Sequence, residues 1–198
     1  MNKQDVIAFF DMLAPTWDVG MVHNDRIIGT ILANANIRGG VSVLDVACGT
    51  GVLIPDYFKA GAEHVTAIDF SSEMIKTARP KFTGEINSGR LELVCADVEE
   101  YCPDTRFDCI LVYNAFPHFP DGDRLIAHLS SLLVPGGTLS VAHGMSRDAI
   151  NAHHSGSAKD ISVGLMSETG LAEIFAKYLK VTAVISNAEM YQVAGVFT

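Results

Sequence analysis

Apolar residues recur along this chain with two different spacings. As far as residue 40 they return every three or four positions, in one stripe over residues 6–13 and a second over 27–35. This spacing places them on one face of a helix, and Pro15 and the pair Gly39-Gly40 end the two stripes. From residue 41 onward, short β-rich apolar runs alternate with helix-like segments. The pattern predicts two N-terminal helices followed by a repeated strand–turn–helix unit.

Five apolar runs of strand length carry this repeat, at residues 41–46, 64–69, 91–97, 107–114 and 136–143. Strands that alternate with helices form parallel sheets covered on both faces. The chain ends differently, in two β-rich runs on either side of a turn at Asn187-Ala188, which predicts a hairpin. We therefore expect an α/β fold: a doubly wound, mostly parallel sheet of seven strands, with helices on both faces and a C-terminal antiparallel hairpin.

No internal repeat, low-complexity tract or linker divides the chain, so residues 1–198 are expected to form a single domain. Within it we expect a helical cap at 1–40, a ligand-binding core at 41–143 and a C-terminal helix and hairpin at 167–198. The intervening residues 144–166 show the least regular pattern. Because they follow the fifth strand, they are expected to form a partly helical active-site loop.

Composition excludes several classes of protein. Nearly half of the residues (48%) are apolar, which argues against disorder, yet no run approaches the roughly 20 apolar residues that span a bilayer. No secretory signal pattern opens the chain, so we expect a cytoplasmic location. The formal net charge is −9, without a Lys/Arg cluster, so no nucleic acid partner is expected. Four cysteines lack C-x-x-C spacing, and the three in or beside apolar segments are expected to be buried, reduced thiols.

The most informative segment is VLDVACGTG, residues 43–51, in which a strand leads through a glycine-rich turn into a helix. Gly49 and Gly51 permit a sharp turn and the close approach of a ligand. The helix N-terminus presents N–H groups suited to a carboxylate, and Asp45 supplies a negative charge suited to an ammonium group. A methionyl group carries both. A dinucleotide site is less well supported because its third glycine position is Ile54, and a turn that only closes the fold is the remaining alternative.

Two further acidic residues end the next two strands. Asp69 lies about twenty residues after the glycines, where its carboxylate can accept hydrogen bonds from both hydroxyls of a ribose. Asp97 ends the third strand, where it can accept a hydrogen bond from an adenine amino group. Either residue alone could be a helix cap or turn residue. Together with Asp45 they place three acids on the carboxyl edge of one sheet, where open α/β sheets bind ligands.

The segments VLDVACGTG, AIDFSSEMI, ADVEE, FDCILVYNAFPHF and LLVPGGTLSV resemble the class I S-adenosylmethionine-dependent methyltransferases over residues 41 to about 142. The resemblance implies a Rossmann-like fold with S-adenosylmethionine as cofactor. It implies that the methionyl end contacts Asp45, Ala47, Gly49, Gly51 and Asn114, the ribose contacts Asp69 with Phe70 beside it, and the adenine contacts Met74, Asp97 and Val98. Ala47 stands where many relatives carry a glycine.

The acceptor side is less defined. The opening FFDMLAPTWD is similar to that of the ubiquinone/menaquinone-biosynthesis C-methyltransferases over about ten residues, which suggests a small acceptor, aromatic or quinone-like. His118 and His143 follow the fourth and fifth strands and are the candidate bases, while His153 and His154 lie in the loop beyond. No ligand spacing indicates a metal site, and a homodimer is left open.

Two functions follow from this interpretation. The first is an enzyme that aligns the methyl donor with a small-molecule acceptor and removes a proton where the acceptor requires it. The second is a non-catalytic protein that binds S-adenosylmethionine or S-adenosylhomocysteine as a sensor or partner. The complete set of acids and the aromatic acceptor side favour the enzyme, whereas the methylated atom stays open.

Overall fold

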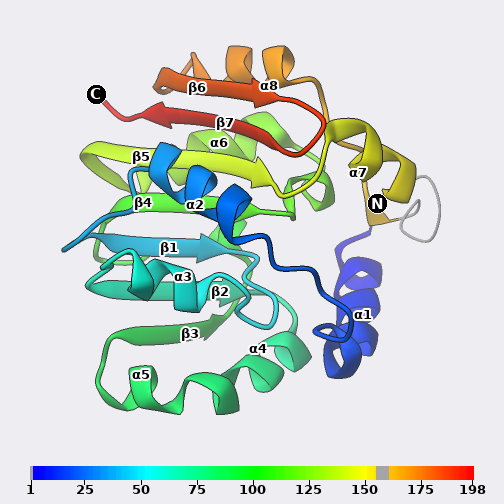
Figure 1. Cartoon of the computed structure of the whole chain (residues 1–198), viewed down its shortest axis with the longest axis vertical. Coiled ribbons are helices and arrows are strands. Elements are labelled where there is room, and N and C mark those ends of the chain that lie inside the picture. Colours follow the sequence, from blue (N-terminus) through cyan, green and yellow to red (C-terminus); the bar gives the residue numbers. More distant parts are fainter. Residues whose placement is uncertain (1, 155–160) are drawn as a thin grey trace.

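The computed structural model describes residues 2–154 and 161–198, and its centre is a seven-stranded sheet in the order β3-β2-β1-β4-β5-β7-β6 (Figure 1). The strands are β1 (Ser42–Val46), β2 (His64–Asp69), β3 (Leu91–Cys95), β4 (Phe107–Tyr113), β5 (Leu133–His143), β6 (Lys180–Ser186) and β7 (Tyr191–Val196). The first five strands are parallel, while β7 lies antiparallel between β5 and β6. The predicted Rossmann-like α/β fold is confirmed.

The C-terminal hairpin forms where the sequence predicted it. Ser186 pairs with Tyr191 at its end, and the Asn187 N–H donates to the Met190 carbonyl at 3.0 Å. The Asn187 side chain accepts hydrogen bonds from the backbone N–H groups of Glu189 and Met190, both at 2.9 Å. An asparagine that binds its own backbone two residues ahead stabilises a turn of this kind.

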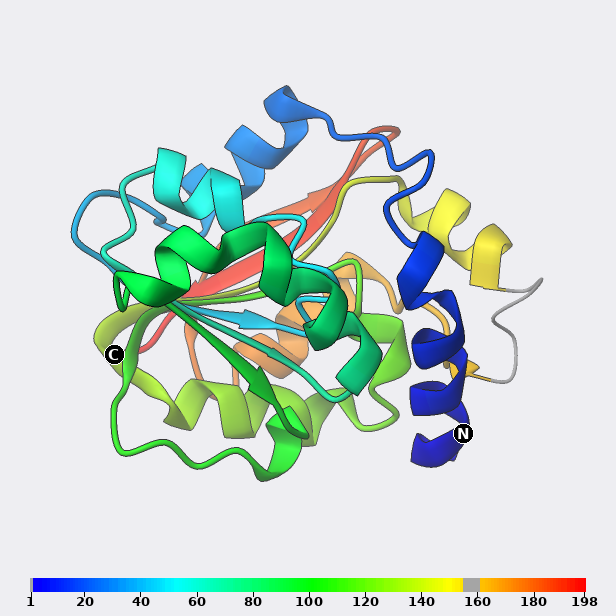
Figure 2. The ribbon, with the colours of Figure 1, turned by 90° about the horizontal axis from the view of Figure 1, so that it is seen from below.

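Helices cover both faces of the sheet (Figure 2). They are α1 (Lys3–Leu13), α2 (Asp25–Asn34), α3 (Ile54–Lys59), α4 (Ser72–Ala78), α5 (Thr83–Asn87), α6 (Gly122–Ser131), α7 (Arg147–His154) and α8 (Glu168–Phe175), with 3₁₀ turns η1 (Ala14–Thr16), η2 (Arg79–Phe82), η3 (Val98–Glu100) and η4 (Phe116–His118). Helix α4 ends at Ala78, two residues before Pro80. Pro80 lacks an N–H and cannot continue the α-helical hydrogen bonds, so the segment closes as η2.

Two apolar layers hold these helices on the sheet. On β4, Cys109 and Leu111 belong to the layer under α2, α3 and α4, whereas Ile110 and Val112 belong to the layer under α6 and α8. All four residues are completely buried, as expected where alternate side chains of a central strand face opposite covered faces.

Three cysteines were expected to be buried. Cys48 and Cys109 are buried, but Cys95 is exposed. The reason is topological, because Cys95 ends β3, which pairs only with β2 and forms one edge of the sheet.

Helices α1 and α7 lie beyond the carboxyl ends of the parallel strands, and Figures 1 and 2 both place them next to each other. Val6 of α1 is buried against Ile161, with Phe9, Phe10 and Phe70 packed around them. The carboxyl edge is therefore covered by chain segments far apart in sequence. Within the described ranges, no helix has the length and apolar character needed to cross a bilayer.

Candidate active site

A cavity of about 690 Å³ opens at this carboxyl edge. Most of the predicted site residues line it: Asp45, Ala47, Gly49, Asp69, Phe70, Met74, Asp97, Val98, Asn114 and His118. Two others, Gly51 and His143, are described by the structure but are not part of the lining. The strand ends thus bring together residues separated by up to 73 positions. Its lining combines carboxylates at the strand ends with apolar side chains from α1 and from the segment after β4.

The glycine-rich turn contains three residues in the left-handed region, with φ of +54° at Ala47, +55° at Gly49 and +86° at Gly51. A Cβ at Gly51 would lie 2.5 Å from the Phe82 ring and 2.8 Å from Ile54. Gly51 is therefore required for the packing of the turn against its neighbours. At Gly49 the nearest heavy atom, in Trp17, would be 3.7 Å away, which leaves room on the cavity side.

Asp45 is a buried carboxylate with a single side-chain donor described, the Tyr57 hydroxyl, which donates to Asp45 Oδ1 at 3.0 Å. Burial raises the pKa of Asp45 to about 7, the Tyr57 hydrogen bond opposes the shift, and the charge of Asp69 adds to it. A cation bound in the cavity would stabilise the ionised form. This side chain is suited to an ammonium group.

Asp69 joins the glycine-rich turn to the start of α4. Its Oδ2 accepts the Gly49 N–H and its Oδ1 accepts the Ser71 N–H, both at 2.8 Å. Burial raises the pKa of Asp69 to about 6, against the effect of these backbone donors. Each carboxylate oxygen keeps a second lone pair, so ribose hydroxyls can still donate to it.

Asp97 is contacted from α1. Its Oδ1 accepts the Glu99 N–H at 3.0 Å, which caps η3, while its Oδ2 accepts a hydrogen bond from the Lys3 ammonium group. The side-chain hydrogen bond to Asp97 is the main reason that the pKa of Lys3 is raised. The residue predicted to bind the adenine amino group therefore also fastens the N-terminal helix.

Further side-chain contacts hold the N-terminal segment over the cavity. The Ser71 hydroxyl donates to Asp11 at 2.5 Å, and Asp18 accepts from the Thr50 hydroxyl at 2.5 Å and from the Lys81 ammonium at 2.6 Å. These contacts join residues 32 to 63 positions apart in sequence, and no local pattern marked Asp11 or Asp18 in advance.

His118 lies in η4 on the cavity wall. Its Nδ1 is 2.8 Å from the Ile161 carbonyl oxygen, and its ring contacts the Phe10 ring edge-on at a centroid distance of 5.0 Å. Burial lowers the pKa of His118, and the Ile161 carbonyl opposes this shift. Donation from Nδ1–H to that carbonyl makes Nε2 the basic nitrogen of the neutral ring.

The other histidines lie elsewhere. His143 is buried at the end of β5 with its ring 6.0 Å from that of Tyr191 and does not line the cavity, so its assignment as a base stays a prediction. His153 and His154 end α7, and their side chains lie outside the described part of the structure. Asn114, with φ +53°, accepts the Gly144 N–H at 3.0 Å and so joins the ends of β4 and β5.

Comparisons with known proteins agree with this geometry. Residues 43–137 match the methyltransferase domain family. The chain is 30% identical over 145 residues to a ubiquinone biosynthesis O-methyltransferase of Coxiella burnetii, covering 70% of this chain and 61% of the relative. It is 33% identical over 115 residues to a ubiquinone/menaquinone biosynthesis C-methyltransferase of Francisella tularensis, covering 56% and 45%. The chain therefore spans about three fifths or less of the length of these relatives.

The solved structure of the N-methyltransferase NodS from Bradyrhizobium japonicum, in complex with S-adenosyl-L-homocysteine, superposes with a TM-score of 0.72 at 15% identity over 98% of this chain and 97% of NodS. The domain match and the shared fold together support a class I S-adenosylmethionine-dependent methyltransferase. The methyltransferase domain match covers residues 43–137, a little under half of the chain, and the likeness to NodS with bound S-adenosyl-L-homocysteine is consistent with S-adenosylmethionine as the cofactor.

Proposed function

We propose that this protein transfers the methyl group of S-adenosylmethionine to a small, largely apolar acceptor of aromatic or quinone-like character. The observation that carries the proposal is that two chemically different groups of side chains line one cavity. Asp45, Asp69 and Asp97 are suited to the cofactor, and aromatic side chains of α1 and of the segment after β4 are suited to the acceptor.

The charge of the lining supports a neutral acceptor. Among the described residues, the lysine and arginine of the lining are Lys3 and Arg124, and both form ion pairs with Glu99 or Asp97 at the adenine end. The rest of the lining includes Phe9, Phe10 and Phe119. Among the described lining residues, an acceptor bearing a phosphate or carboxylate would meet no unpaired guanidinium or ammonium group, whereas an aromatic ring would bury apolar surface.

The residues of this chain then act by position. Asp45 holds the methionyl ammonium group, Asp69 the ribose, and Asp97 with Val98 the adenine edge. When bound, the cofactor would supply an electrophilic methyl group carried on its sulfonium. His118 Nε2 takes the proton from an acceptor hydroxyl, and α1 excludes water from the site. The overall charge of −9 supports a small-molecule acceptor over a nucleic acid.

The proposal is tested with methyl-labelled S-adenosylmethionine and a panel of neutral phenols, catechols and hydroquinones beside matched benzoates and aryl phosphates. We expect label on one or more neutral acceptors and little on the charged ones. The Asp45→Asn variant, which loses the partner of the ammonium group, is the control for enzyme-dependent transfer. Tight binding of S-adenosylhomocysteine with no transfer to any acceptor would instead support the non-catalytic sensor.

A further inference from the structure

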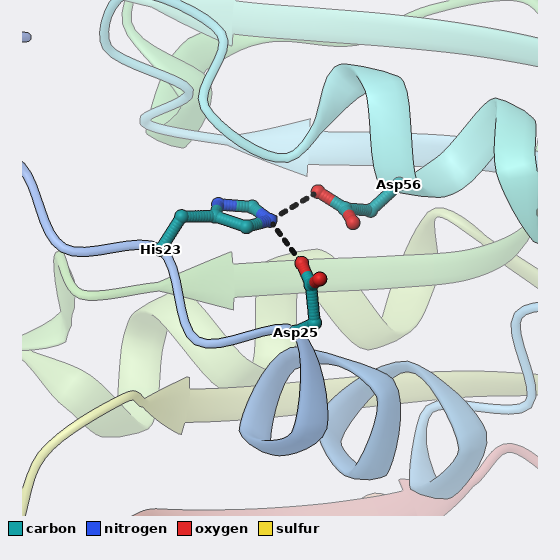
Figure 3. Close-up of side chains that lie close together, drawn as sticks. All are labelled: His23, Asp25 and Asp56. Carbon is teal, nitrogen blue, oxygen red and sulfur yellow. Dashed lines mark ion pairs between the residues drawn. The ribbon is translucent and has the colours of Figure 1, made fainter.

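A second group of polar side chains, separate from the predicted site residues, brings His23, Asp25 and Asp56 close together (Figure 3). His23 precedes α2, Asp25 is the first residue of α2, and Asp56 lies in the first turn of α3. His23 Nε2 is 3.4 Å from Asp25 Oδ1 and 3.3 Å from Asp56 Oδ2. One ligand atom from each residue lies within 4.8 Å of the other two. Sequence spacing did not reveal this group, because Asp56 is 33 positions from His23.

The two carboxylates share one ion-pair partner, His23, and in the described part of the chain neither pairs with a lysine or arginine. The Asp25 side chain is 79% exposed, whereas that of Asp56 is only 13% exposed. The Oδ2 atom of Asp56 is fully buried and accepts no hydrogen bond from the described residues. A buried carboxylate oxygen without a donor is costly, and a bound cation would remove that cost.

A protonated His23 accounts for this arrangement only in part. Its distances to the two oxygens exceed the 2.7–3.2 Å or so of an N–H···O hydrogen bond, and a single Nε2–H cannot point at both carboxylates. The distances do fit a shared metal ion. With ligand bonds of about 2.0–2.1 Å, two ligand atoms of a tetrahedral zinc site lie about 3.3–3.4 Å apart.

We propose that His23, Asp25 and Asp56 form a binding site for a divalent transition metal ion, best matched by zinc. One imidazole and two carboxylates supply three ligands, and a fourth position is left for water or another oxygen ligand. Because His23 also lines the cavity beside Met21 and Val22, the ion would lie on the cavity wall. It would also join the N-terminal ends of α2 and α3.

The test uses metal-stripped full-length protein and does not depend on activity. Titration with Co²⁺ should give the intense visible absorption of four-coordinate cobalt at one equivalent, and calorimetry with Zn²⁺ should give the same stoichiometry. His23→Ala and Asp56→Asn should each weaken Zn²⁺ binding at least about tenfold. They should also abolish the rise in melting temperature that Zn²⁺ causes in the parent protein.

Glu63→Gln, which removes an exposed carboxylate outside the cluster, is the matched control and should bind like the parent. Far-UV circular dichroism checks that each variant is folded, and His23, on an exposed loop, is the safer substitution. Binding through the exposed Cys95 or Cys102 would show thiolate-to-cobalt absorption and survive His23→Ala. That result, or no binding at one equivalent, would overturn the proposal.

Discussion

At the scale of single residues, the site depends on carboxylates that the fold keeps out of water. Asp45 and Asp69 are 3% and 6% exposed, and burial raises the pKa of both. Asp69 receives two backbone N–H donors, whereas the described side-chain donor to Asp45 is one tyrosine. Asp45 is therefore the group whose charge depends most on what enters the cavity.

This difference predicts a pH dependence. Burial raises the pKa of Asp45 from its ordinary value of 3.8 to about 7, so between these pH values the folded state holds a proton that the unfolded chain releases. Stability without ligand should thus fall as pH rises from about 4 to 7. An ammonium ligand prefers ionised Asp45, so S-adenosylhomocysteine affinity should rise up to about tenfold per pH unit below pH 7 and then level off. Calorimetry at pH 5.5, 6.5 and 7.5 measures this, and Asp45→Asn should flatten the profile.

The turn residue Ala47 leads to a second prediction. Its φ of +54° costs a non-glycine residue roughly 1–2 kcal/mol. Ala47→Gly removes that cost but adds about 0.4–1 kcal/mol of unfolded-chain entropy, so we expect a net gain of about 0.5 kcal/mol in the free energy of unfolding. Ala60, with φ −75°, is the control, and Ala60→Gly should destabilise. Urea unfolding of both variants measures this. If Ala47→Gly lowered the free energy of unfolding as much as Ala60→Gly, the prediction would be wrong.

His118 carries the third prediction. If its Nε2 removes a proton from the methyl acceptor, His118→Ala should lower the single-turnover transfer rate about 10²-fold. The affinity for the cofactor should stay within about twofold. His143→Ala, made in parallel, should leave the rate per folded molecule unchanged because that ring is outside the cavity lining. A normal transfer rate in the His118→Ala variant would show that His118 is not the general base.

At the scale of elements, the N-terminal segment is held to the core by acid–base and hydroxyl contacts with α4, η2, η3 and the glycine-rich turn. The sequence predicted the helix itself from its apolar spacing. It did not predict these contacts, because they join residues as far as 94 positions apart and depend on how the helix crosses the sheet edge. Periodicity reports which face of a helix is buried, not which polar groups it meets.

The Lys3–Asp97 pair makes α1 a candidate lid. Lys3 occupies one oxygen of the carboxylate predicted to bind adenine, so Lys3→Met should speed S-adenosylhomocysteine association by up to about fivefold, the range of an exposed ion pair. Trp17, the single tryptophan, lines the cavity and reports binding by stopped-flow fluorescence. Lys76→Met, which breaks an ion pair with Glu73 on α4, is the matched control. Equal association rates in the parent protein and both variants would argue against a lid held closed by the Lys3–Asp97 ion pair.

At the scale of the whole molecule, what was predictable follows from periodicity and from topology. Alternating strands and helices determine a parallel sheet. The carboxyl edge of that sheet then brings Asp45, Asp69 and Asp97 together, independently of the conformation of the loops. The separate functions of similar residues were not predictable. Gly51 serves packing against Phe82, and His143 is not part of the cavity lining although it ends β5 at the same edge of the sheet. Such differences depend on three-dimensional packing, which a single sequence does not encode locally.

The last prediction concerns how the covering segments act together. Residues 161–166 are tied to the cavity wall, because Ile161 contacts His118 and the Val163 N–H donates to the Pro117 carbonyl at 2.9 Å, while Asn151 of α7 accepts the Leu165 N–H at 2.6 Å. An acceptor bound against His118 should therefore order α1, α7 and residues 161–166 as one unit. Hydrogen exchange in these segments should slow with S-adenosylhomocysteine and acceptor together, more than with either alone. The central strands β1 and β4 serve as the internal control, since global stabilisation would slow them equally, and equal slowing there would mean that no lid closes.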